Sequence, residues 1–475
     1  MSDTPTQRVN GVYDLAVIGA GSAGFSAAIT AADDGARVAL IGHGTIGGTC
    51  VNVGCVPSKA MIRAMDTLHV AKVAQRFNGV SANAEVTDWQ AVIRQKQALV
   101  DELRAAKYID VLPSYNSIAY LKGQASFTGD GKLTVAGNHV DAAKVIIATG
   151  SRPHIPEIRG LDSVEHHDST SILELEELPK SLLVMGGGYI GVELAQMFTR
   201  AGVAVTIVTR SGLLPGAEPE VSAALTDYFR DEGVTVLHGL TYDSVAEIDG
   251  QIQLSVTADG RPKTVSADKL LLATGRLPNA DGLGLAEADI ATNGRGGIAI
   301  DAHMRTSRKG VYAAGDVTGQ DQFVYMAAYG AKIAAKNAMN SDSLSYDNDV
   351  VPSVVFCDPQ VASVGLTEVQ AKNAGFEVKT SVLGLENVPR ALAARDTRGL
   401  IKLVADSVTK KLLGAHILAP EGSDSIQTAA MAIKAGMTYE DLGAMIFPYL
   451  TTVEGLKLAA QTFDQDVSKL SCCAG

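Results

Sequence analysis

The feature that most constrains this chain is a glycine-rich turn that occurs twice, each time between an apolar strand and a helix. The first turn follows the apolar residues 14–19 and the second follows residues 181–186, and a further apolar stretch comes after each helix. In such a unit the first glycine permits the tight turn, the second lets a pyrophosphate approach the backbone, and the third lets helix and strand pack closely. The six glycines of the two G-x-G-x-x-G motifs are Gly19, Gly21, Gly24, Gly186, Gly188 and Gly191. Two complete units predict two dinucleotide-binding domains, because the free N–H groups at each helix start also hold phosphate charge.

Shorter repeats indicate how the two domains are arranged along the chain. KVIIATG ends at Gly150 and KLLLATG ends at Gly275. A third segment with a similar pattern, GVYAAGDVTG, contains Asp316. The order predicts an α/β fold in which one Rossmann-like domain is inserted into the other. We expect a first domain of residues 1–152 and 280–348, and a second of residues 153–279. From residue 349 to 475 the glycine-rich loops stop, and short strands with one amphipathic helix predict a third, α+β domain.

Composition narrows the class of partner and the location. With 475 residues, of which 46% are hydrophobic and 19% charged, the chain has the composition of a folded protein of about three domains. The formal net charge of −12 argues against nucleic acid or a membrane surface as a partner. There is no apolar run of about eighteen residues, and the first thirteen residues lack the apolar stretch of a secretory signal. These observations predict a cytoplasmic protein without a membrane insertion.

Four of the five cysteines occur in two close pairs. Cys50 and Cys55 lie in GGTCVNVGCVPSK, a glycine-rich turn that opens a helix, and the adjacent Cys472 and Cys473 lie in the tail. Cys50 and Cys55 can close a small disulfide ring, and a helix N-terminus lowers thiol pKa values and favours the reactive thiolate. No further cysteine or histidine is spaced for a structural zinc site. Cys357 stands alone in an apolar stretch and is predicted to be buried packing.

The motifs GAGSAG, GGTCVNVGCVPSK, the two ATG segments, GGGYIG and AAGD occur in this order over essentially the whole chain. In this set and order the chain resembles the flavin-dependent disulfide oxidoreductases, which include lipoamide dehydrogenase and glutathione reductase. The resemblance implies FAD in the first domain, a pyridine nucleotide in the second, and a head-to-tail homodimer formed through the third. The positions that the resemblance places at the FAD are Gly19, Gly21, Gly24, Gly48, Thr49, Lys59, Gly150 and Asp316, and those at the nicotinamide dinucleotide are Gly186, Gly188, Gly191, Arg210 and Gly275.

The same resemblance assigns roles to individual side chains. Cys50 would be the interchange thiol, distal from the flavin, and Cys55 the thiol that stacks on the flavin ring. Lys59 would lie near the flavin and pair with Glu193, the alternative being a surface ion pair. Tyr189 would take the place of the residue that gates the nicotinamide pocket, the alternative being a packing role.

Residues after the second strand of each unit bear on cofactor choice. In the second domain this region reads VTR without an acid, and Arg210 suits a 2′-phosphate, which favours NADPH over NADH. The alternative is a solvated arginine on a loop. In the first domain the corresponding segment reads Ile41-Gly42-His43, so the acid that usually holds the ribose hydroxyls is missing there too. Asp316 is the better-placed acid on the flavin side.

The segment FPYLTTVEG indicates which reaction the family resemblance implies. Members that reduce organic disulfides carry a His–Glu pair here, and alignment on Glu454 puts Tyr449 at the histidine position. A phenol with a pKa near 10 is a poor acid at pH 7, whereas a soft metal ion held by two thiolates accepts two electrons without a proton. With this segment and the terminal SCCAG, the chain is similar to the mercury(II)-reducing members of the family.

That similarity implies the NADPH-dependent reduction of Hg(II) to elemental mercury. Thiol-bound Hg(II) would be taken up by Cys472 and Cys473 of the partner subunit and passed to Cys50 and Cys55, with Tyr449 of the partner subunit assisting. Only some thirteen residues precede the first expected strand, so we expect the core enzyme without the small metal-binding domain that many such enzymes carry. A thioredoxin- or glutathione-reductase-like disulfide reductase is the nearest alternative, and a non-catalytic metal-binding protein is a more distant one.

Overall fold

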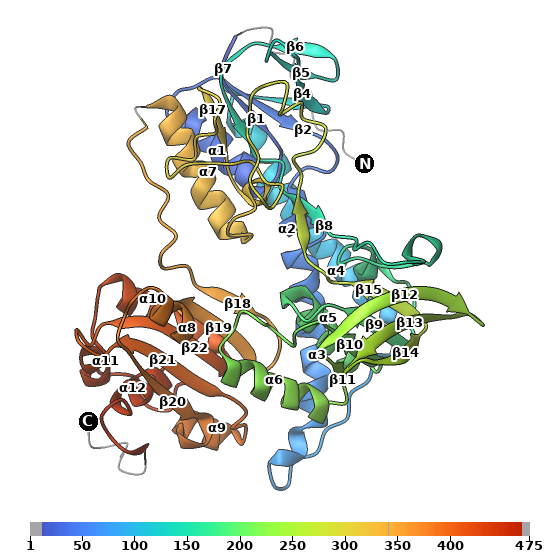
Figure 1. The fold of residues 1–475 in the computed structure, drawn as a ribbon, viewed down its shortest axis with the longest axis vertical. Helices are drawn as coiled ribbons and strands as arrows, with labels where there is room; N and C mark the ends of the chain where they lie inside the picture. Colours follow the sequence, from blue (N-terminus) through green and yellow to red (C-terminus); the bar gives the residue numbers. More distant parts are fainter. Residues whose placement is uncertain (1–11, 341, 468–475) are drawn as a thin grey trace.

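The computed structural model describes residues 12–340 and 342–467. It forms three lobes, with the first glycine-rich turn in the upper lobe of Figure 1 and the second in the lower right lobe. The third lobe is built from the C-terminal part of the chain. Cys472 and Cys473 lie outside the described residues.

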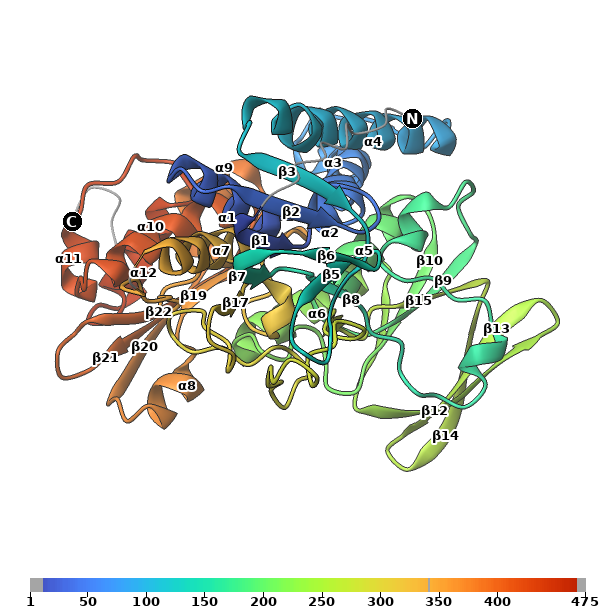
Figure 2. The same cartoon turned by 90° about the horizontal axis from the view of Figure 1, so that it is seen from above.

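The first lobe is built on a five-stranded parallel sheet in the order β17-β7-β1-β2-β3. Helices α1 and α7 pack on one face of this sheet, and a small antiparallel sheet β4-β5-β6 packs on the other (Figure 1). The elements of this lobe are β1 (Tyr13–Ile18), α1 (Ser22–Asp33), β2 (Val38–Gly42), α2 (Gly48–Asn52), α3 (Cys55–Lys72), α4 (Trp89–Arg104), β3 (Ile118–Lys122), β4 (Ala125–Phe127), β5 (Leu133–Val135), β6 (Asn138–Val140), β7 (Ala142–Ile147), β17 (Val311–Ala313) and α7 (Val324–Met339). Long helices α3 and α4 lie side by side and extend from this lobe toward the other two (Figures 1 and 2).

The second lobe repeats the design with a four-stranded parallel sheet in the order β11-β10-β9-β15 and a three-stranded antiparallel sheet against it. Its elements are β9 (Ser181–Met185), α5 (Tyr189–Arg200), β10 (Ala204–Val208), α6 (Pro219–Asp231), β11 (Thr235–Leu237), β12 (Leu240–Ile248), β13 (Gln251–Ala258), β14 (Arg261–Ala267) and β15 (Lys269–Leu272). The chain enters this lobe through β8 (Ser151–Pro153) and leaves it through β16 (Arg276–Pro278), and these two strands pair with each other. Because β17 then rejoins the first sheet, the predicted insertion of one Rossmann-like domain into the other is confirmed.

The third lobe is an antiparallel sheet in the order β18-β19-β22-β21-β20, with helices packed on it. Its elements are β18 (Ser353–Val355), β19 (Gln360–Gly365), α8 (Glu368–Asn373), β20 (Val378–Gly384), α9 (Pro389–Ala394), β21 (Leu400–Asp406), β22 (Leu412–Ala419), α10 (Gly422–Lys434), α11 (Tyr439–Ala444) and α12 (Glu454–Gln461). The predicted α+β class of this domain is confirmed. Strand β20 was not predicted, because it is an edge strand whose side chains are mostly half-buried and whose apolar pattern is correspondingly weak.

The two glycine-rich turns share one steric constraint. A Cβ atom on Gly24 would lie 1.7 Å from the carbonyl oxygen of Gly19, and a Cβ on Gly191 would lie 2.1 Å from the carbonyl oxygen of Gly186. Gly19 and Gly186 themselves have φ of +122° and +113°, which side chains rarely adopt. A side chain at Gly24 or Gly191 would therefore force the helix away from the turn, and one at Gly19 or Gly186 would strain the turn itself.

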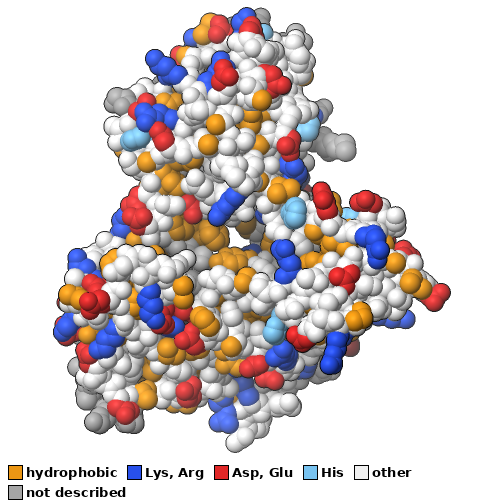
Figure 3. Space-filling model, in the orientation of Figure 1, with side chains coloured by type: hydrophobic (Ala, Val, Ile, Leu, Met, Phe, Trp, Pro, Cys, Tyr) orange, Lys and Arg blue, Asp and Glu red, His pale blue; other side chains and the backbone are white. Residues whose placement is uncertain are grey.

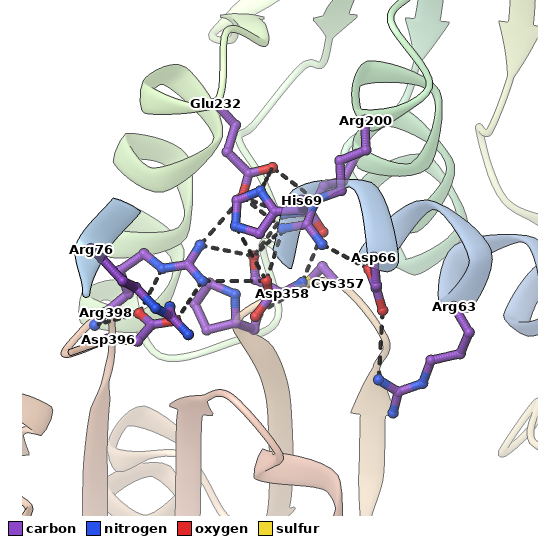
Figure 4. A network of polar contacts seen from close by, with 12 residues as sticks. Arg63, Asp66, His69, Arg76, Arg200, Glu232, Cys357, Asp358, Asp396 and Arg398 are labelled. Atoms are coloured by element: carbon purple, nitrogen blue, oxygen red, sulfur yellow. Dashed lines mark hydrogen bonds and ion pairs between the residues drawn. The ribbon is translucent and has the colours of Figure 1, made fainter. Parts of the chain in front are cut away.

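A buried ion network joins the three lobes (Figure 4). Arg200 of α5 is 3% exposed, and its guanidinium donates to Asp66 of α3 at 2.7 Å, to Glu232 at 2.8 Å and to Asp358 of the third lobe at 2.9 Å. Arg398 adds a second guanidinium, at 3.3 Å from both Glu232 and Asp358. Moving one lobe away from the others would leave buried charges of this network without their partners. The network therefore fixes how the three lobes dock on one another.

Within that network, His69, Glu232 and Asp358 lie close enough for their ligand atoms to surround a metal ion. The neighbouring guanidinium groups of Arg200 and Arg398 occupy the same carboxylates and would repel a cation. Burial and these charges also lower the pKa of His69. We therefore assign the three residues a structural role.

Among the described residues, no helix is both long and apolar enough to cross a membrane.

Candidate active site

The three lobes enclose a cavity of about 1170 Å³. Figure 3 shows the hollow between them, with hydrophobic side chains at its rim. The first glycine-rich turn, both cysteines of the predicted pair, the β8–β16 crossing, the start of α5 and a few residues of the third lobe line its wall. The volume exceeds that of ordinary small-molecule pockets, so the cavity has room for a ligand of the size of a dinucleotide.

The residues around the first turn fit the pyrophosphate of a dinucleotide. Gly21 is the residue before α1, and no side chain caps the free N–H groups of that helix. Gly48 approaches so closely that a Cβ on it would lie 2.6 Å from the Cα of Gly21. The two backbones thus form a cradle that only glycine permits, and it opens into the cavity. Gly188 before α5 is likewise uncapped and has open space where a side chain would stand, which fits a second dinucleotide.

Asp316 lies on the cavity wall in a short hydrogen-bonded chain. The Ser151 hydroxyl donates to its carboxylate at 2.6 Å, and the Arg276 guanidinium donates to the same hydroxyl oxygen at 2.8 Å. Asp316 was predicted from the sequence, whereas Ser151 and Arg276 were not. The sequence did contain a signal for Ser151 and Arg276, since they directly follow the repeated ATG segments that end at Gly150 and Gly275.

Cys50 and Cys55 face each other as free thiols at the junction of α2 and α3. Cys55 is the first residue of α3, as the sequence predicted. A hydrogen bond from the Cys50 thiol, assisted by the nearby charge of Lys59, lowers the pKa of Cys55 to about 7. The same hydrogen bond and burial raise the pKa of Cys50. Cys55 is therefore the thiol of the pair that ionises around neutral pH, with about half of it thiolate at pH 7, and Cys50 stays a thiol that donates to it.

Lys59 and Glu193 form the predicted pair. The ammonium group lies 2.6 Å from the carboxylate, and Glu193 is only 7% exposed, so the interpretation as a surface pair is wrong. Glu193 also accepts a hydrogen bond from the backbone N–H of Phe356 at 2.8 Å, and the Lys59 ammonium lies 5.1 Å from the Phe356 ring centre. This contact joins α3, α5 and the third lobe beside the dithiol. Phe356 was missed by the sequence analysis, where nothing distinguished it from other apolar residues.

The two predicted tyrosines occupy different places. Tyr189 lines the cavity, 42% exposed, and its ring centre lies 6.1 Å from that of Phe323. Tyr449 lies 57% exposed before α12, outside the cavity wall formed by the described part of this chain. Arg210 is exposed just beyond β10. Cys357 is 2% exposed, which confirms its prediction as buried packing.

The Cys55 thiolate gives the site a testable pH dependence. Alkylation of Cys55 by iodoacetamide, followed by mass spectrometry of its peptide in the reduced protein, should rise with a midpoint near pH 7, because the thiolate is present above this pKa and lost below it. Lys59→Met should move the midpoint upward and lower the rate at pH 7 about fivefold, since it removes the stabilising charge. Lys72→Met, at the exposed far end of the same helix, should change neither quantity. An unchanged midpoint in Lys59→Met would contradict this account.

Comparison with known proteins places the site in a family. Residues 13–335 match the pyridine nucleotide-disulphide oxidoreductase family, and residues 351–460 match the dimerisation domain of the same family. The chain is 46% identical to a mercuric reductase of Bacillus cereus over 98% of its own length and 73% of that protein. It is 47% identical to a mercuric reductase of Streptomyces lividans over 98% of both chains.

A solved structure shows the same architecture. The HOCl-induced flavoprotein disulfide reductase RclA from Escherichia coli superimposes with a TM-score of 0.84 at 32% identity, over 94% of this chain and 99% of that one. It has also been solved as a Cu(II) complex. The nested dinucleotide-binding domains, the dithiol at their junction and these matches lead to one conclusion: the chain belongs to the pyridine nucleotide-disulphide oxidoreductase family, whose enzymes combine a flavin with a pyridine nucleotide, and it carries that family's dimerisation domain.

Proposed function

We propose that this protein reduces Hg(II) to elemental mercury in the cytoplasm, with electrons that NADPH supplies through FAD. The Cys50–Cys55 pair carries the proposal, because it presents a thiolate at neutral pH in the cavity where both dinucleotide sites meet. The relatives named mercuric reductase, at 46% and 47% identity, support mercury as the substrate. Tyr449, at the place of the proton-donating histidine, supports a metal ion over an organic disulfide.

The reaction requires this chain's residues to bind Hg(II) and to keep a thiolate available. Cys50 and Cys55 bind Hg(II) through sulfur, the ligand atom that this soft ion prefers, and Lys59 keeps Cys55 in the thiolate form. The backbones of Gly21 and Gly48 would hold the pyrophosphate of FAD, which when bound would supply an electron pair from NADPH beside the dithiol. Hg(II) takes up both electrons and leaves as the uncharged atom, while the two sulfurs remain as they were. No proton is needed at the metal, so a phenol at residue 449 is no disadvantage.

The dimer and the tail complete the proposal. The third lobe matches a dimerisation domain, and Tyr449 lies on it, exposed and away from the dithiol of its own chain. A head-to-tail homodimer would bring Tyr449 of one protomer to the dithiol of the other. We propose that Cys472 and Cys473, outside the described residues, capture thiol-bound Hg(II) and transfer it across the same interface.

The choice of NADPH rests on Arg210, which is exposed beyond β10 with no acid beside it. Arg210→Glu should raise KM for NADPH about 10- to 100-fold, because it replaces a charge-assisted contact to the 2′-phosphate with repulsion. KM for NADH should change by less than about threefold. Arg261→Glu, at an exposed position on β14 of the same lobe, is the matched control and should leave both values unchanged. If Arg210→Glu changed KM for NADPH and for NADH equally, Arg210 would not bind the 2′-phosphate.

The experiment that tests the function compares electron acceptors. NADPH oxidation is measured with HgCl₂ in excess thiol, with glutathione disulfide, with oxidised thioredoxin and with Cu(II), and mercury vapour is collected in the first reaction. We expect one mercury atom released per NADPH and little turnover with either disulfide. Turnover with a disulfide alone would overturn the proposal. It would support a disulfide reductase instead, the second candidate that the structural similarity to RclA favours.

A further inference from the structure

The carboxyl end of β2 lacks the group that usually holds a ribose. In dinucleotide-binding units an acid at this corner accepts hydrogen bonds from the ribose hydroxyls. Here the strand ends at Gly42, and a Cβ atom on Gly42 would lie 2.2 Å from the hydroxyl oxygen of Tyr120 and 2.7 Å from its Cζ. The space of a carboxylate side chain is thus already filled by a phenol from the neighbouring strand.

The register of the sheet explains how Tyr120 reaches this corner. β2 and β3 are parallel, and Tyr120 pairs with Leu40, two residues before the end of β2. The Tyr120 ring packs in the core beneath α1 and α7, and its hydroxyl extends along the strands to Gly42. Tyr120 is an edge-strand residue 78 positions after Gly42, so the contact depends entirely on the fold.

The Tyr120 hydroxyl is placed for a ligand. The side chain is only 6% exposed, yet it forms part of the wall of the large cavity together with His43 and Thr45. No hydrogen bond joins this hydroxyl to any of the residues that the structure describes. Buried tyrosine hydroxyls normally have a partner, so an unpaired one at a cavity wall indicates that the partner belongs to the bound molecule.

We propose that the Tyr120 hydroxyl binds the adenosine ribose of the dinucleotide in the first lobe, in place of a carboxylate. The inference rests on the proposed function only in taking FAD as that dinucleotide. A phenol both donates and accepts, so it can serve either ribose hydroxyl. Burial raises the pKa of Tyr120, so the group stays neutral at physiological pH. The corner therefore binds the ribose without a negative charge.

The first test compares FAD with an analogue in which 2′,3′-dideoxyadenosine replaces the adenosine. Dissociation constants are measured by flavin fluorescence after the protein is reconstituted with each compound. Tyr120→Phe should weaken FAD binding about 3- to 10-fold, the effect of one neutral hydrogen bond, and should change binding of the analogue by less than about twofold. Equal weakening for both compounds would mean a packing effect alone and would overturn the inference.

Two control variants sharpen this comparison. Tyr312→Phe removes another buried phenol of the same core, on β17 at the opposite edge of the sheet, where its hydroxyl donates to Asp342 at 2.7 Å. It should bind FAD and the analogue as the native protein does. His43→Ala removes the exposed polar residue next to Gly42. A ribose-dependent loss in His43→Ala and none in Tyr120→Phe would assign the contact to His43 and contradict the proposal.

A residue exchange tests the steric part of the inference. Gly42→Glu alone should lower FAD affinity more than 10-fold, because its Cβ overlaps the Tyr120 hydroxyl. Gly42→Glu combined with Tyr120→Val, a residue suited to a strand, should restore affinity to within about threefold of native. If the single variant fails to fold, thermal unfolding of the double variant still reports the rescue. No rescue would overturn the proposal, whereas native protein that binds FAD but does not reduce Hg(II) would overturn the proposed function alone.

Discussion

Replacing Cys55 with serine is expected to lower the rate of Hg(II) reduction by about 10³-fold or more, with FAD still bound. Serine keeps the size of the side chain, but its hydroxyl is not ionised at neutral pH and its hard oxygen is a poor ligand for a soft ion. Without this ligand, Hg(II) is no longer coordinated by two sulfur atoms beside the flavin. Each tenfold loss in rate corresponds to about 1.4 kcal/mol of lost transition-state stabilisation. Mercury vapour release with NADPH measures the effect.

Cys357→Ala is the matched control for this experiment. Unlike Cys55, which is exposed, Cys357 is a buried cysteine, 2% exposed, and it lies outside the wall of the large cavity. Its removal should cost some stability through the small cavity left behind and should keep turnover within about threefold of native. Flavin absorbance of each purified variant reports whether FAD is retained. Mercury release by Cys55→Ser at a rate close to native would disprove the assignment of the dithiol.

Arg200→Met is expected to destabilise the folded protein by about 3–5 kcal/mol. The substitution leaves three carboxylates, Asp66, Glu232 and Asp358, partly buried with one guanidinium fewer, and breaking a buried pair from one side costs this much. At about 2–4 °C per kcal/mol, the value for a domain of about 150–250 residues, the loss lowers the unfolding midpoint by roughly 6–20 °C. Differential scanning calorimetry at pH 7 measures the midpoint. Because α3 carries both Asp66 and Cys55, the variant should also release its bound flavin at a lower temperature.

The control for Arg200 is Arg63→Met. Arg63 also contacts Asp66, at 3.6 Å, but the Arg63 side chain is 71% exposed, whereas that of Arg200 is 3% exposed. Exposed pairs of this kind contribute about 0–1 kcal/mol, so the midpoint should move by no more than a few degrees. If the two variants unfold at the same temperature, the network does not hold the lobes together.

Local sequence patterns were sufficient to predict most of the fold. The two glycine-rich turns and their strands depend on residues close together in sequence, and the return of the chain to the first sheet was indicated by the repeated segment around Asp316. The same holds for Cys55, which opens α3 because Gly54 precedes it. The Lys59–Glu193 contact spans 134 positions and was predicted only through the family resemblance. The roles of Tyr189, Tyr449 and Arg210 remain predictions, as does the relay through Cys472 and Cys473.

Contacts that depend on how segments meet were missed. The ion network around Arg200 combines residues from three lobes, and each of them in isolation resembles an ordinary surface charge. Tyr120 resembles an ordinary strand residue until β3 is placed beside β2. The missing acid at Gly42 was noticed in the sequence, but the group that fills its place could only be seen once the order of the strands was known.

The steric constraint shared by the two glycine-rich turns separates two requirements that act on this chain. Gly24 and Gly191 have no room for a single methyl group, and this holds whatever dinucleotide is present. The groups that we propose for the ribose of one dinucleotide and the 2′-phosphate of the other, Tyr120 on β3 and Arg210 just after β10, lie outside both turns. A change of ligand in either half therefore has a direct route, through those side chains, with the turn unchanged. An engineer can follow the same route and retarget either half without redesigning its backbone.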